Sequence, residues 1–337
     1  MNPRQRVMSV TEVHAKMKPF IRIAAIVAAV ACMAATFVQS KNPDDILKSI
    51  NQFRSESIAD ARAAGERIDI NALNEQIATK ANEAVEGVDP TKVEASQAYS
   101  WAQIFSMAGR HKETCDLAAR FLRTYPPVQE RYAAHMLLLS SCNTMGDGGM
   151  IADVLPDVVA PNLALSQSFL RTVVSSYAGT IADDEGIEAA FEAIDAAMAQ
   201  VKFETPEEYA KRMLPSYKAR NMKNRDGSDR TDEQLTAQLL SSGKMVNDSL
   251  PYAVADKKSK LLNDAGRKDE ALRVLKAFVD SSDPASAYVR RAESAIKQTE
   301  MIGSPATSLN FGRKYGDFKS LEDWKGKVVI IDFTAHW

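Results

Sequence analysis

The sequence predicts a mainly α-helical body followed by a short C-terminal segment with β-strand character. Apolar residues recur at helical spacing through residues 41–300, as at Ile46, Ile50 and Phe53, and almost no alternating strand pattern occurs there. From residue 301 the pattern changes to short extended pieces separated by turns. A length of 337 residues also corresponds to about two domains. We therefore expect a helical body at 41–300 and a distinct segment at 301–337.

The composition narrows the classes of function. Hydrophobic residues make up 45% of the chain and charged residues 26%, which is ordinary for a soluble globular protein. The net charge of -2 provides no basic excess for following a phosphate backbone, so we expect no nucleic-acid partner. Aromatic residues, at 7%, fit helices built on Ala and Leu rather than a β-sandwich. We expect neither a metal ion nor a cofactor.

The first 40 residues carry an export signal. A basic segment that includes Arg4 and Arg22 precedes an uncharged, largely apolar run at 23–40, and this arrangement inserts with its positive end in the cytoplasm. The end of the run suits a signal peptidase, which favours cleavage. The alternative is a membrane anchor, which needs about 20 apolar residues. Cys32 is interpreted as part of this signal rather than as a lipid acceptor. We expect a periplasmic protein, or one anchored with its body outside the cytoplasm.

Two stretches of the body share a helix–turn–helix pattern. Residues 96–126 and 252–284 each contain an Ala-Gly-Arg turn, and the glycine supplies the left-handed backbone that closes the first helix. Small residues after the turn, including Ala118 and Ala271, allow the two helices to approach closely. A weaker third copy spans 163–202, with Gly186 at its turn. Hairpins of this kind cannot bury their apolar faces alone, so we expect them to stack.

The hairpin pattern resembles the tetratricopeptide repeat (TPR), whose period is about 34 residues. The turn glycine, the small residues and the closing prolines, Pro126 and Pro284, fit this family, whereas its usual aromatic positions are diluted. The resemblance implies a stack of hairpins that binds a protein or peptide partner. The alternative is an irregular helical bundle built from the same helix–turn–helix chemistry.

A polar stretch at 218–234 lies between the second and third of these copies. It is interpreted as a solvated loop, with Thr231 or Asp232 as the cap of the following helix. Asp226 and Asp229 resemble a calcium loop superficially, but the spaced acidic ligands and the closing glutamate of such a loop are missing. We expect a plain loop.

The three cysteines contain no Cys-x-x-Cys redox or zinc pair, because none lies within three residues of another. If the helices around Pro126 run antiparallel, Cys115 and Cys142 sit about five residues, or roughly 7 Å, apart in height. That offset is near the limit for a disulfide. We expect two buried, unpaired thiols, with a structural disulfide as the alternative. His111 lies one helical turn from Cys115, but a His–Cys nucleophile is the weaker interpretation.

The segment 301–337 carries the most specific pattern. After a helix-breaking GSPA at 303–306, residues 328–333 form a run typical of a strand covered on both faces. The chain then reads DFTAHW at 332–337. These features resemble the start of the TlpA/ResA-like, or redoxin, branch of the thioredoxin superfamily, in which such a strand ends Asp-Phe-x-Ala-x-Trp before Cys-x-x-Cys. Thr334 and His336 depart from the usual pattern.

This resemblance implies roles for two residues. Asp332 corresponds to the carboxylate that accepts or relays a proton near the dithiol, and burial should raise its pKa. Trp337 corresponds to the residue that flanks the first cysteine and shapes the surface that substrates contact. The nucleophilic cysteine itself would follow Trp337 and is absent from these 337 residues. The alternative for Asp332 is a strand-end residue that faces solvent.

A peroxiredoxin is the competing resemblance, because Asp-Phe-Thr also occurs near its peroxidatic cysteine. That motif requires Cys three residues after the threonine and Pro four before it, where this chain has Trp337 and Ile330. An unpaired apolar strand at 328–333 would be an aggregation hazard, so we expect residues 301–337 to be the start of an incomplete α/β thioredoxin-like domain.

The sequence therefore predicts an exported thiol–disulfide oxidoreductase with a helical protein-interaction domain. Its substrates would be protein thiols or disulfides, and the 337-residue chain would be inactive because the dithiol is missing. The alternative is a non-enzymatic TPR-like scaffold whose thioredoxin-like module is redox-inactive.

Overall fold

A computed structural model describes residues 42–220, 223–224, 227–301, 304, 324 and 326–327. This part of the chain is mainly helical, as the periodicity predicts, and its only extended pairing is an isolated bridge between Lys223 and Asp229. None of its helices combines the length and the apolar character needed to cross a membrane. The signal predicted at 1–40 and the strand predicted at 328–333 lie outside the described residues.

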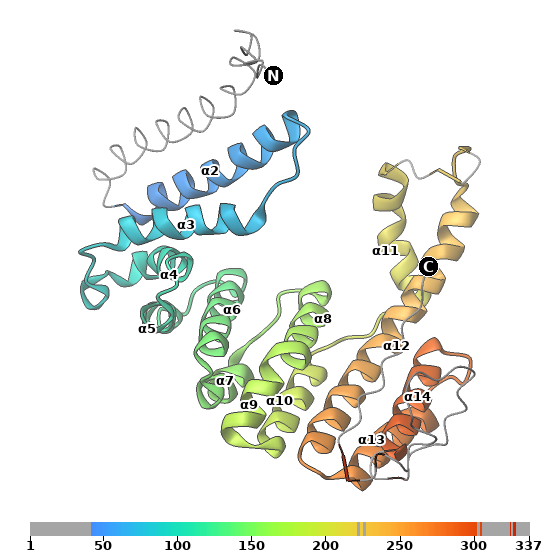
Figure 1. Ribbon diagram of the computed structural model, residues 1–337. Helices are drawn as coiled ribbons and strands as arrows, with labels where there is room; N and C mark the ends of the chain where they lie inside the picture. Colours follow the sequence, from blue (N-terminus) through green and yellow to red (C-terminus); the bar gives the residue numbers. More distant parts are fainter. Residues whose placement is uncertain are drawn as a thin grey trace, which may run out of the picture. The chain divides into compact units, whose positions relative to one another are not determined.

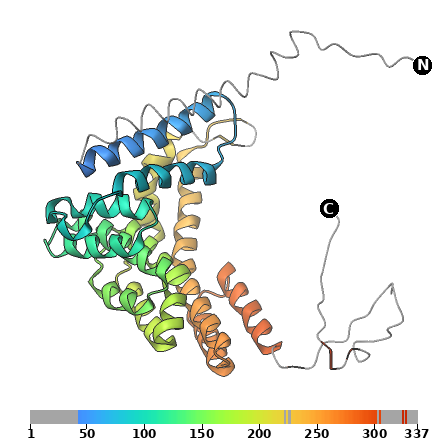
Figure 2. The same cartoon turned by 60° about the vertical axis from the view of Figure 1, so that its left-hand side comes forward.

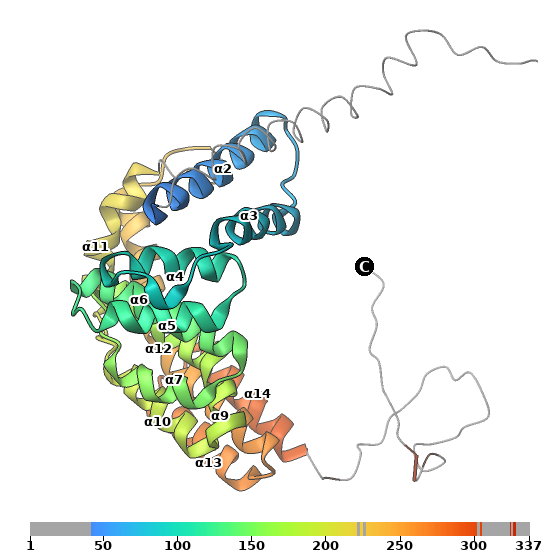
Figure 3. The ribbon, with the colours of Figure 1, turned by 90° about the vertical axis from the view of Figure 1, so that its left-hand side faces the viewer.

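The chain divides into two compact units, one up to Lys202 and one from Phe203. The helical region predicted as a single domain at 41–300 is thus shared between them. The first unit contains α2 (Pro43–Ala63), α3 (Ile70–Val85), α4 (Ala98–Met107), α5 (His111–Leu122), α6 (Val128–Met145), α7 (Gly148–Val154), α8 (Leu163–Thr172), α9 (Ala178–Glu185) and α10 (Ile187–Ala199). Figures 1 and 3 show the unit progressing from α2 and α3 at one end to α9 and α10 at the other.

The core of the first unit lies between helices that are neighbours along the chain. Its largest fully buried side chains are Ile50, Ile104, Phe105, Leu117, Leu139, Ile151, Leu155, Phe169, Leu170, Ile181 and Ile194. One close approach depends on a glycine at the start of α7. A Cβ atom on Gly148 would lie 2.5 Å from the carbonyl oxygen of Thr180, so no larger residue fits against α9 without movement.

The second unit contains α11 (Pro206–Ala219), α12 (Asp232–Asp264), α13 (Lys268–Ser281) and α14 (Ala287–Met301). α12 continues through Pro251, and α11 packs on its N-terminal half, where a Cβ atom on Gly243 would lie 3.0 Å from Pro206 Cα. α13 and α14 pack with the C-terminal half of α12, and Figure 2 shows the three helices next to one another in shades of orange. Phe278 of α13 is buried between them in a small cluster with Ala255, Val289 and Ala292.

The loop before α12 begins later than the sequence suggests, because α11 remains helical to Ala219. The end of the loop lies where the sequence predicts it. Thr231 caps α12, accepting a hydrogen bond from the backbone N–H of Gln234, whose side chain accepts one from the N–H of Thr231 in return.

The two stretches predicted as hairpins are α4–α5 and α12–α13, and they turn in the same way. Gly109 has a φ of 73° and Gly266 a φ of 74°, in the left-handed region that glycine adopts readily. After each glycine, the backbone N–H of an arginine donates to the carbonyl oxygen of the residue five positions earlier. Arg110 donates to Phe105 at 2.9 Å, and Arg267 donates to Leu262 at 2.8 Å. This is the Schellman pattern of helix termination.

The side chains that follow the turn also match. Arg110 pairs with Glu113, and Arg267 pairs with Glu270 at 2.8 Å. The predicted third copy differs, because Gly186 between α9 and α10 has a φ of 95° and donates only to the carbonyl of Ala182, at 3.2 Å. It therefore closes α9 without the longer Schellman bond.

Candidate functional site

Two cysteine side chains meet inside the first unit. Cys115 lies in the second turn of α5 and Cys142 in the last turn of α6, and these two helices pack against each other. Their Sγ atoms are 3.5 Å apart, both thiols are free, and the exposed fractions are 7% for Cys115 and 0% for Cys142. The structure thus brings together the two cysteines that the sequence placed near the limit of contact.

The sulfur atoms are closer than the axial offset of roughly 7 Å because side chains lean along their helices. The Cα–Cβ bond of a helical residue tilts toward the N-terminus of its helix. On α6 this tilt carries the Cys142 side chain toward the connection at Pro126, and on α5 it carries Cys115 away from that connection. The two tilts therefore reduce the offset counted from residue numbers.

The two thiols differ in their acid–base character. Their mutual hydrogen bond lowers the pKa of Cys115 below its usual value, because a Cys115 thiolate can accept the proton of Cys142. The same hydrogen bond, together with burial, raises the pKa of Cys142. Cys115 Sγ also lies 3.9 Å from the carbonyl oxygen of Leu138. Ionisation of one thiol therefore disfavours ionisation of the other, and Cys115 is the one that retains accessible surface.

Neither described histidine assists these thiols. His111 precedes Cys115 by four residues, but its Nδ1 atom is buried without a hydrogen-bond partner, so no His–Cys hydrogen bond through that atom supports a nucleophile there. His135 on α6 is also buried, its Nδ1 lacks a partner, and burial lowers its pKa. Neither Nδ1 atom therefore activates a thiol through a hydrogen bond.

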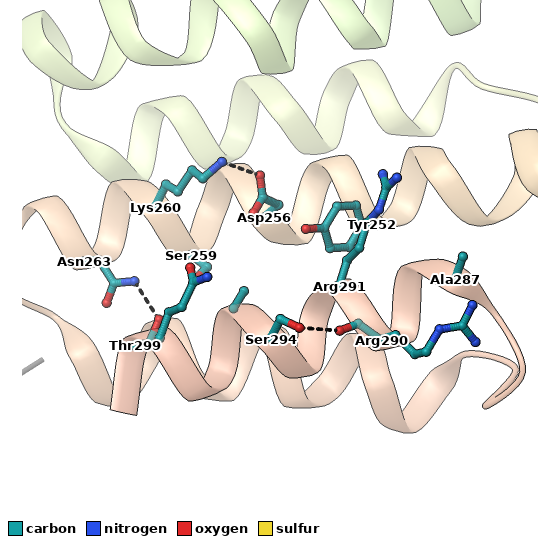
Figure 4. Close-up of a pocket in the computed structure, with 12 residues that line it drawn as sticks. Tyr252, Asp256, Ser259, Lys260, Asn263, Ala287, Arg290, Arg291, Ser294 and Thr299 are labelled. Atoms are coloured by element: carbon teal, nitrogen blue, oxygen red, sulfur yellow. Dashed lines mark hydrogen bonds and ion pairs between the residues drawn. The ribbon is translucent and has the colours of Figure 1, made fainter. Parts of the chain in front are cut away.

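A groove of about 860 Å³ runs between α12 and α14 in the second unit (Figure 4). It is lined by Tyr252, Asp256, Ser259, Lys260 and Asn263 of α12, and by Ala287, Arg290, Arg291, Ser294, Ala295, Gln298 and Thr299 of α14. Most of these side chains are polar. The volume lies within the usual range of about 300–1,000 Å³ for ligand sites.

Positive charge dominates the groove. Lys260 donates to Asp256 at 2.7 Å, so these two charges offset each other. The guanidinium of Arg291 lies 5.0 Å from the ring centre of Tyr288, and that of Arg290 reaches only the carbonyl of Ala285, at 3.5 Å. Neither arginine contacts a carboxylate within the part of the chain that the structure describes. Two positive charges are therefore available to a ligand.

One end of the groove also offers an unused acceptor. Asn263 donates from Nδ2 to the hydroxyl of Thr299 at 3.1 Å, while its buried Oδ1 has no hydrogen-bond partner. A buried acceptor without a partner is costly, and because this atom is closed off from the groove, a peptide N–H group reaches it only when the Asn263 side chain turns. The groove can thus bind both an anionic group and a backbone amide.

The groove was not predicted from the sequence, although part of its signal is visible there. Tyr252, Asp256 and Asn263 recur at helical spacing on α12 and define one polar face of the second hairpin. Which helix lies opposite that face depends on the fold of α13 and α14. Asp332 and Trp337, the residues assigned redox roles, lie outside the described residues.

Within the described ranges, no group of three or more His, Cys, Asp or Glu side chains is arranged to hold a metal ion. Comparison of the chain with protein-family models, with curated proteins and with solved structures gave no match.

Proposed function

We propose that this chain is the partner-binding part of an exported thiol–disulfide oxidoreductase of the thioredoxin-like, TlpA/redoxin type. In this proposal the helical body is a TPR-like array that binds polypeptide, and residues 301–337 begin the domain that exchanges disulfides with protein substrates. The groove between α12 and α14 is the observation that carries the binding role. The redox role is supported by the DFTAHW pattern at 332–337.

The chemistry of the groove favours an acidic polypeptide segment. Arg290 and Arg291 have no carboxylate partner among the described residues, so a glutamate or aspartate of the partner can pair with either guanidinium. Once its side chain turns, Asn263 can accept a hydrogen bond at Oδ1 from the backbone of the same segment. An extended peptide presents both kinds of group at once.

A direct test is binding of fluorescein-labelled peptides, one rich in Asp and Glu and one of the same length rich in Lys. We expect the acidic peptide to bind and its affinity to fall as salt rises. Replacing Arg290 and Arg291 together by Glu should weaken binding at least about tenfold, or ~1.4 kcal/mol.

Arg273→Glu provides the matched control for this test. Arg273 lies on α13, its side chain is 73% exposed, and it does not line the groove. The substitution therefore reverses one arginine charge in the same unit and leaves the lining of the groove unchanged. Equal binding of both peptides, or equal weakening by Arg273→Glu and by either groove reversal alone, would contradict the proposed binding role.

The redox role requires a separate experiment. The chain extended by the residues that its reading frame encodes beyond Trp337 should reduce or oxidise a disulfide-containing protein substrate, and the chain ending at Trp337 should not. A Cys-x-x-Cys directly after Trp337 is the sequence that we expect. Asp332→Ala in the extended chain should slow exchange, with a change in its pH profile.

A non-enzymatic scaffold is the second candidate. It is supported by the groove between α12 and α14, whose positively charged lining can bind a partner without any redox step. In that case the acidic peptide would still bind to the groove, whereas the extended chain would show no thiol–disulfide exchange. The two experiments therefore separate the candidates.

A further inference from the structure

We propose that Cys115 and Cys142 form a redox pair that closes to a disulfide across the α5–α6 interface, with Cys115 as the attacking thiol and Cys142 as the resolving thiol. The basis is their placement. The two Sγ atoms are already 3.5 Å apart and belong to two helices that are packed together. Closing a bond of about 2.05 Å requires the sulfur atoms to approach by roughly 1.5 Å, which side-chain rotation can supply.

The order of attack follows from exposure. Cys115 retains 7% of its accessible surface and Cys142 none, so an external disulfide can reach Cys115 first. Both cysteines lie near helix ends, with Cys115 in the second turn of α5 and Cys142 in the last turn of α6. Local opening near a helix end costs less free energy than global unfolding. The hydrogen bond from Cys142 also stabilises the thiolate of Cys115.

The reaction uses an external disulfide as the oxidant, either a small molecule or a protein. Cys115 gives its proton to solvent, and its thiolate attacks one sulfur of the external disulfide, whose S–S bond breaks and releases one thiol. Cys142 then loses its proton and attacks Cys115 Sγ, and the second external thiol leaves. Two electrons pass from the protein thiols to the external disulfide, which is reduced to two thiols.

The bond would join two successive hairpins. Cys115 belongs to the second helix of α4–α5, and Cys142 to the first helix of α6–α7, so the disulfide closes a loop between two residues that are 27 positions apart in the sequence. Cross-linking these residues restricts the unfolded chain. This inference does not rest on the thioredoxin-like domain, and it needs only an oxidising environment such as that outside the cytoplasm.

The test uses the full chain with Cys32→Ser, which leaves only these two thiols, and oxidised glutathione as the probe. Trypsin places Cys115 in the peptide 113–120 and Cys142 in the peptide 132–171. We expect the oxidised protein to yield these two peptides linked, with the loss of two hydrogen atoms. We also expect the Tm of the first unit to rise on the order of 10 °C over the reduced protein.

Single variants test the order of attack. Cys142→Ser should stop at a mixed disulfide of glutathione on Cys115, whereas Cys115→Ser should gain no adduct while it stays folded. Cys115→Ala and Cys142→Ala replace the serine variants if these lose their helical circular dichroism. No linked peptide from a folded protein, equal adducts on both variants, or an unchanged Tm after oxidation would each overturn the proposal.

Discussion

The hairpins α4–α5 and α12–α13 have the same turn but different surroundings. Each begins its turn with a glycine at positive φ, closes it with an arginine N–H, and pairs that arginine with a glutamate three residues on. In the first hairpin the helix before the turn presents Ala102, which is fully buried against neighbours. The corresponding position of the second hairpin is Ser259, which is also buried, at 3% exposed, but borders the groove.

The turn therefore specifies a hairpin but not the surroundings of its helices. Seven residues before the turn glycine stands an alanine in one case and a serine in the other, and ten before it stand Tyr99 and Asp256. Tyr99 stacks on Phe121 at 5.1 Å, whereas Asp256 pairs with Lys260 in the groove. The same backbone therefore supports a closed core in one unit and a polar groove in the other.

The largest expected effect comes from a buried phenylalanine that occupies the same position in both hairpins, and it tests whether both depend on that residue. Phe121 and Phe278 each lie 12 residues after the turn glycine, with exposed fractions of 8% and 7%. We expect Phe121→Ala and Phe278→Ala each to cost about 3–5 kcal/mol, because a large aromatic side chain leaves a cavity. Urea unfolding followed by circular dichroism measures this, with the exposed Phe203→Ala as the control. A cost below ~1 kcal/mol for either anchor would break the equivalence of the hairpins.

The turns themselves should respond equally but less strongly. A Cβ atom on Gly109 or Gly266 would meet nothing within 4 Å, so the cost of an alanine there comes from the left-handed backbone alone. We expect Gly109→Ala and Gly266→Ala each to lose about 1–2 kcal/mol. Asparagine tolerates this conformation better than alanine, so Gly109→Asn and Gly266→Asn should lose less stability than the alanine variants. Alanine variants as stable as the parent would show that the turns can adopt another backbone.

The features that the sequence predicts are local ones. The turns at Gly109 and Gly266 and the cap at Thr231 follow from residues within one or two helical turns, and the structure confirms them. The groove and the thiol contact depend instead on which helix faces which. Residue counting placed Cys115 and Cys142 too far apart because it omitted the tilt of their side chains. No local pattern indicates that α14 returns opposite the polar face of α12.

The smallest expected effect distinguishes the two arginines of the matching turns. The guanidinium of Arg110 lies 5.2 Å from the ring centre of Phe105, a cation–π contact, whereas Leu262 occupies the equivalent position beside Arg267. Arg267→Ala should cost little, because its partly exposed ion pair with Glu270 is weakened by solvent and salt. Arg110→Ala should cost about 0.5–1 kcal/mol more than Arg267→Ala, the contribution of an exposed cation–π contact.

A double-mutant cycle with Phe105→Leu isolates that contact, because leucine makes the first turn resemble the second. In the Phe105→Leu background, Arg110→Ala should cost no more than Arg267→Ala does in the parent protein. In the parent protein, the extra cost of Arg110→Ala over Arg267→Ala should also persist at high salt, since screening weakens the ion pairs more than the contact with the ring. If the excess survives the leucine substitution, the difference between the two turns must come from a residue other than Phe105.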